Sequence, residues 1–205
     1  MHARWLAAAV TAVVLVVPPA ALGGAAERDV SAIHAMQPGL PVVGGWSALV
    51  RNDNGIAATV HAEGLAPGTV VTLWWVVFND PSRCTWGSHA FADFGADGQL
   101  SCALGDVLFN PAAVVSVQYA AGHVIGGSGT ADYGAYLGEG DTSGCAAAAL
   151  PCNGLLDSRA ADVHLVLRSH GMAIPGLIDE QLSSFNGGCP PNACMNLEAS
   201  PHEVG

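Results

Sequence analysis

Thr69-Val-Val-Thr-Leu-Trp-Trp-Val-Val-Phe78 is the stretch that decides the fold. It has the length of one strand and is rich in β-branched and aromatic residues, which favour extended structure. Successive side chains of a strand point to opposite faces, so Trp74 and Trp75 cannot form one platform for stacking a sugar. Because both faces are apolar, we expect a central strand that is covered on both sides, with the two tryptophans in the core.

The segments on either side of this strand have an alternating pattern. Over 56–63 the apolar residues occupy every second position, which predicts a strand with one core face and one solvent face. Over 162–169 the same pattern points Val163, Leu165 and Leu167 inward and His164 outward. Further strands are expected over 46–51, 114–124 and 130–137. Short strands joined by turn signals predict an all-β chain, an antiparallel β-sandwich.

One segment near the C-terminus has the spacing of a helix. Leu177, Ile178, Leu182 and Phe185 recur at helical intervals after Pro175, which predicts one short helix over 176–185. The residues beyond Cys194 are polar and few, so we expect a frayed tail.

The first residues indicate the compartment. Arg4 is followed by an apolar run over 5–17, a proline pair and small residues ending at Ala26, the order typical of a secretory signal peptide. The run is shorter than the ~20 residues of a membrane-spanning helix. We therefore expect a signal peptide over 1–26 and one secreted domain over 27–205, periplasmic or extracellular, with no membrane span after cleavage.

Six cysteines in an exported chain predict three disulfides. Spacing favours local pairs, each around a loop rich in Gly, Pro or Asp: Cys84 with Cys102, Cys145 with Cys152, and Cys189 with Cys194. Each bridge stabilises the fold by about 2–3 kcal/mol in the chain-entropy account, and together they tie long loops over 80–111 and 138–161. No Cys-x-x-Cys pair occurs, so we expect no metal site rather than the alternative of a zinc site.

The charge balance excludes several functions. The chain contains seventeen acidic residues, six arginines and no lysine. Walker phosphate loops, pyridoxal enzymes and Ser-x-x-Lys acyl enzymes all need a lysine. Nucleic-acid binding needs a basic face. The sequence thus predicts neither nucleic-acid binding nor a cofactor.

Two motifs carry a resemblance. Trp74-Trp-Val-Val-Phe-Asn79 followed by Pro81, and Val163-His-Leu-Val-Leu-Arg-Ser-His-Gly171, are similar to the signature of a family of uncharacterised, mostly bacterial secreted proteins. That resemblance implies secretion but no assigned activity. The second motif also distantly resembles chordin-type domains and the copper/zinc superoxide dismutase sandwich, which implies an immunoglobulin-like or dismutase-like architecture. Dismutase chemistry would need a His-x-His pair, and the chain has none.

Arg168 and His170 are the candidate binding residues. They are two positions apart at the end of a predicted strand, where Asp141 or Glu180 would complete an anion or acid-base site. In the structural alternative, Arg168 pairs with an acidic neighbour and His170 hydrogen-bonds a loop carbonyl.

Two other sites depend on strand pairings that the sequence does not define. A shared metal site would need His61, His123 and His164 to meet. A Ser-His-Asp hydrolase stays open because geometry, not spacing, defines a triad. We assign no catalytic residue. The hypothesis is a non-enzymatic binding or envelope-associated structural protein with a protein or surface partner; the alternative is an exported metal-dependent or hydrolytic enzyme using Arg168 and His170.

Overall fold

The computed structural model describes residues 24–37, 39–87, 100–146 and 150–204. The predicted signal peptide lies almost wholly outside this range. The strands are β1 (Glu27–Ala35), β2 (Pro41–Asn52), β3 (Gly55–Ala62), β4 (Thr69–Phe78), β5 (Val115–Val124), β6 (Ala131–Gly138), β7 (Asp162–Met172) and β8 (Met195–His202). The helices are α2 (Leu104–Phe109), α3 (Ile178–Ser183) and the 3-10 turns η1 (Pro81–Arg83) and η2 (Pro111–Ala113). None of the described helices is long and apolar enough to cross a bilayer.

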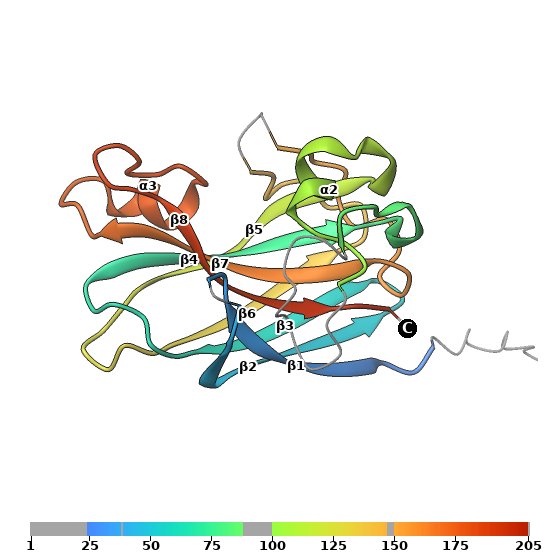
Figure 1. Ribbon diagram of the computed structural model, residues 1–205, viewed down its shortest axis with the longest axis horizontal. Helices are drawn as coiled ribbons and strands as arrows, with labels where there is room; N and C mark the ends of the chain where they lie inside the picture. The colour runs from blue at the N-terminus through green and yellow to red at the C-terminus, as the bar shows by residue number, and fades with distance from the viewer. Residues whose placement is uncertain (1–23, 38, 88–99, 147–149, 205) are drawn as a thin grey trace, which may run out of the picture.

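All eight strands belong to one antiparallel sheet, in the order β5-β4-β7-β8-β1-β2-β3-β6 (Figure 1). Twist curls the sheet until its edge strands β5 and β6 approach each other. The antiparallel β class is therefore confirmed, but the shape is near that of a barrel rather than clearly a sandwich of two layers.

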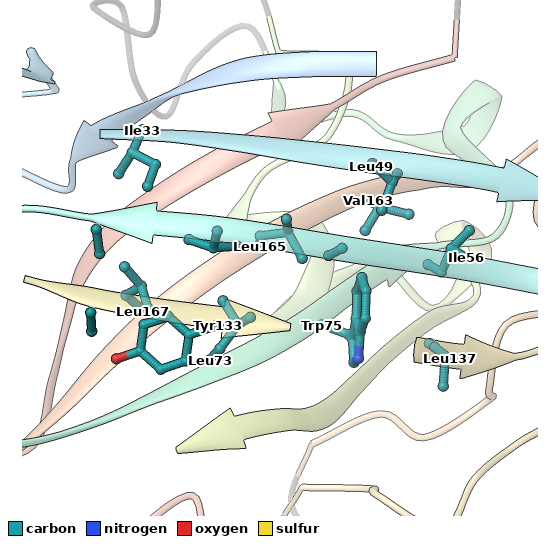
Figure 2. Close-up of a cluster of buried hydrophobic side chains, with 14 of the residues drawn as sticks. Ile33, Leu49, Ile56, Leu73, Trp75, Tyr133, Leu137, Val163, Leu165 and Leu167 are labelled. Atoms are coloured by element: carbon teal, nitrogen blue, oxygen red, sulfur yellow. The ribbon is translucent and has the colours of Figure 1, made fainter. Parts of the chain in front are cut away.

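The main core fills the inside of this curled sheet. Figure 2 shows inward side chains from different strands meeting there, among them Ile33, Leu49, Trp75 and Leu165. The alternation predicted for β3 is confirmed, because its even-numbered apolar residues are at most 4% exposed. Burial of these side chains supplies the driving force for closing the sheet.

A second core lies on the outer face of β4. Trp74, Phe78 and Val117 form it together with Cys102, while Trp75 belongs to the inner core. The prediction that the tryptophans occupy opposite faces of a doubly covered strand is thus confirmed. The covering layer consists of α2 and α3 with the loops around them; both helices contact β5, and α3 also contacts β4 (Figure 1).

The three predicted cysteine pairs lie at disulfide distance, with Cα–Cα separations of 5.1, 5.7 and 5.9 Å. The Cys145–Cys152 loop runs beside β5, where Cys145 bridges to Gln118 and Cys152 to Ser116. The described ends of this loop thus cover the edge of β5 at Ser116 and Gln118, which would otherwise be open to pairing with another chain.

The C-terminal tail differs from the expectation. Residues after Cys194 form β8, which pairs with β7 along most of its length and continues the sheet toward β1. β1 and α2 were not predicted either. Apolar and polar residues do alternate along β8, but it is the polar ones, Glu198, Ser200 and His202, that are buried. The predicted C-terminal helix exists as α3, shorter than expected.

Candidate functional site

His170 lies where it was predicted, on β7, but it is fully buried. Its Nδ1 is 2.9 Å from the carbonyl oxygen of Gly187, and its Nε2 is 2.8 Å from the Thr72 hydroxyl. A carbonyl only accepts, so Nδ1 carries the proton and Nε2 accepts from Thr72, whose oxygen accepts from Trp74 Nε1. Burial lowers the pKa of His170, so this neutral ring joins β7 to the loop after α3.

Arg168 is also engaged. It donates to the Phe185 carbonyl at 2.8 Å and to Asn196 Oδ1 at 3.0 Å, and its guanidinium lies 4.0 Å from the centre of the Phe185 ring. Neither Asp141 nor Glu180 is among its hydrogen-bond partners in the described part of the chain; Asp141 instead accepts from the backbone of Ser143. The geometry thus agrees with the structural alternative for His170, which hydrogen-bonds a loop carbonyl. Arg168 differs from it, because its partners are a carbonyl and an amide rather than an acidic neighbour.

One group of three metal-type side chains lies close together in the described part of the chain. The ligand atoms of His170, Cys189 and Cys194 are within 4.8 Å of one another, but the two cysteines are at disulfide distance from each other. His61, His123 and His164 do not form such a group. His61 lies between two carboxylates, and its hydrogen bonds with Asp132 and then Glu63 raise its pKa.

A serine, a histidine and an aspartate do meet. Asp29 Oδ2 is 2.6 Å from His202 Nδ1, and His202 Nε2 is 2.7 Å from Ser47 Oγ. This is the order of hydrogen bonds in a serine hydrolase triad. The residues come from β1, β8 and β2, a combination that only the unpredicted strands make possible.

The triad-like array has no access for a substrate. Ser47 and His202 are both 0% exposed, and the Ser47 hydroxyl is also hydrogen-bonded to Ser200. The backbones of β1 and β8 pair at only two positions, His34 with Ala199 and Ala35 with Glu198. The hydrogen bonds of Asp29, His202 and Ser47 therefore stabilise the β1–β8 pairing, which has few backbone hydrogen bonds of its own.

A pocket lies on the outer face of the sheet, beneath α2. Its floor comes from β4, β7 and β8, including Trp74, Val166 and Ala199, and its volume is about 90 Å³. Leu104 and Val107 of α2 line the opposite wall. Leu104 is 47% exposed, so the pocket opens to solvent at this helix. Most lining side chains are apolar, as in small-molecule sites generally.

His164 is the unusual member of this lining. It is 8% exposed, contacts Phe78 edge to face, and its Nε2 is buried without a hydrogen-bond partner in the described structure. Burial, and next the nearby His202, lower its pKa to about 4. The ring is therefore neutral at pH 7, and a buried polar atom without a partner costs about 1–3 kcal/mol. The alternation of the sequence predicted that His164 faces solvent. In the structure α2 covers this face of the sheet, so the side chain is buried.

Asp106 holds α2 over the pocket. Its carboxylate accepts from the backbone nitrogens of Thr85, Trp86 and Ala103 and from the Asn110 amide. Burial acts to raise the pKa of Asp106, but these hydrogen bonds outweigh it and hold the pKa below its usual value. The adjacent Cys84–Cys102 pair ties the same loop. Asp106 and this cysteine pair thus anchor the wall of the pocket.

Comparison with known protein families, with curated proteins and with solved structures finds no match to this chain. The features that bear on function are therefore the pocket and the hydrogen bonds that hold the other candidate residues within the fold.

Proposed function

We propose that this protein is an exported, non-enzymatic binding protein, and that it takes a small, mostly apolar ligand in the pocket beneath α2. The observation that carries the proposal is His164, whose buried Nε2 has no partner in an otherwise apolar pocket. Buried polar atoms in folded proteins are almost always hydrogen-bonded. A ligand hydroxyl that displaces the side chains covering Nε2 would supply the missing partner.

Binding is better supported than the alternative of a metal-dependent or hydrolytic enzyme at Arg168 and His170. Both of those side chains are hydrogen-bonded within the fold. The Ser47 hydroxyl is covered, whereas a hydrolase needs a nucleophile that reaches its substrate. A purely structural role in the cell envelope would give no reason for a preformed pocket with an unsatisfied polar atom.

The proposed site of action is outside the cytoplasm. Three cysteine pairs at disulfide distance fit an oxidising compartment, and the leader-like residues before Glu27 agree with export.

Titration with toluene tests the proposal. The purified chain, with its disulfides intact, is followed by amide chemical shifts, and we expect saturable shifts confined to residues around the pocket. Val166→Phe fills the pocket and should abolish these shifts. Val43→Phe is the matched control, because Val43 is 93% exposed on β2. Shifts that persist in the filled variant, or no saturable shift in the parent protein, would rule the pocket out.

A further inference from the structure

The polar content of the pocket is small and specific. Among the described lining residues, only His164 and Asn196 have polar side chains apart from Trp74, whose indole nitrogen donates to Thr72. Asn196 Oδ1 accepts from Arg168, which fixes the amide and leaves its nitrogen as a donor. From this juxtaposition we infer that the ligand is a neutral molecule with a hydroxyl group on a small hydrophobic body, and that the hydroxyl binds the His164 imidazole. The inference rests on the binding function proposed above.

A hydroxyl group fits the chemistry of His164. A neutral imidazole has one nitrogen that donates and one that accepts, and a hydroxyl group both donates and accepts. It therefore satisfies the ring in either tautomer. A purely hydrocarbon ligand would cover His164 and leave Nε2 without a partner.

The surroundings disfavour an anionic ligand. No charged side chain is among the described lining residues. Arg168, which contacts the lining residues Phe185 and Asn196, already donates its hydrogen bonds to them. The chain carries a net charge of −11, which repels anions at long range. A carboxylate in this pocket would lose hydration without gaining a counter-charge.

The size of the pocket limits the hydrophobic body. An engineered apolar cavity of about 150 Å³ accommodates benzene, whereas this pocket measures about 90 Å³. It thus holds part of a single ring or a short branched chain, with the remainder in contact with Leu104 at the opening.

Three probes of similar shape test the class of ligand: phenol, toluene and benzoate. Phenol and toluene differ by a hydroxyl in place of a methyl group, and benzoate carries a negative charge. Each is titrated into the parent protein and into His164→Leu, and dissociation constants come from amide chemical shifts. His123→Leu, at an exposed histidine of β5, is the matched control.

We expect the preference for phenol over toluene to be about tenfold greater in the parent protein than in His164→Leu, the effect of one hydrogen bond to a buried group. His123→Leu should keep the parental preference, and benzoate should bind more weakly than phenol. An equal phenol preference in parent and His164→Leu, or benzoate binding at least as tight as phenol, would overturn the inference. Toluene binding in the pocket would still support the proposed function in that case, and its absence would remove both.

Discussion

Replacing His164 by leucine should change how the protein responds to acid. Burial holds the pKa of His164 at about 4, against 6.5 for an unperturbed histidine. The unfolded chain therefore takes up this proton at a higher pH than the folded protein does. The stability that the neutral ring provides is complete above pH 6.5 and is lost progressively as the pH falls toward 4.

The magnitude follows from these two values. At 1.36 kcal/mol for each tenfold difference in proton affinity, titration of His164 should remove about 2 kcal/mol of unfolding free energy between pH 8 and pH 5. His164→Leu lacks this loss. At pH 8 the variant should be at least as stable as the parent protein, because leucine removes a buried nitrogen that has no partner.

Urea denaturation of both proteins at pH 8 and pH 5 measures the effect. Subtracting the two unfolding free energies at each pH cancels the groups that titrate in both proteins. The difference should move by about 2 kcal/mol in favour of His164→Leu at pH 5, and His123→Leu controls for loss of a histidine as such. A difference that stays constant with pH would refute the argument that His164 is buried and neutral.

Three further outcomes are expected. Glu198→Gln should stabilise the protein by about 3 kcal/mol at pH 8 and by much less at pH 4, because burial raises the pKa of Glu198 to about 7 and its charged form is penalised as the pH rises through that value. Urea denaturation at both pH values measures the effect, and equal effects would contradict it. Asp106→Ala should lower the free energy of unfolding by about 3 kcal/mol and weaken toluene binding, because the hydrogen bonds that anchor α2 are lost. An unchanged toluene affinity would show that the pocket wall does not depend on Asp106. A fluorophosphonate probe should leave Ser47 unlabelled under native conditions, because its hydroxyl is buried. Labelling that is detected by mass spectrometry and lost in Ser47→Ala would instead support the alternative of a hydrolytic enzyme.

The strands on either side of Thr69–Phe78, and that strand itself, were predictable because their burial follows the local alternation of the sequence. β3, β4 and β7 each bury every second residue on the inner side, and adjacent tryptophans on β4 necessarily face apart. The cysteine pairs were predictable for a related reason, since each closes a short local loop.

β8 could not be predicted in the same way. Its inward residues Glu198, Ser200 and His202 are polar, and they are buried only because partners far away in the sequence, such as Asp29 and Ser47, satisfy them. No local pattern contains those partners.

The pocket escaped prediction for a similar reason. His164 sits at an outward position of an alternating strand, and that pattern alone predicts exposure to solvent. It is buried because α2, which Asp106 anchors, covers this part of the sheet, and α2 begins at Leu104, 60 residues before His164 in the chain. The signal that the sequence did offer was a histidine within an otherwise apolar strand.

A structure of the protein with phenol bound tests the central claim most directly. The account predicts that the ring occupies the space beneath α2 and that its hydroxyl lies within hydrogen-bonding distance of a His164 ring nitrogen. Phenol bound at another surface, or in the pocket with its hydroxyl turned toward solvent, would contradict it.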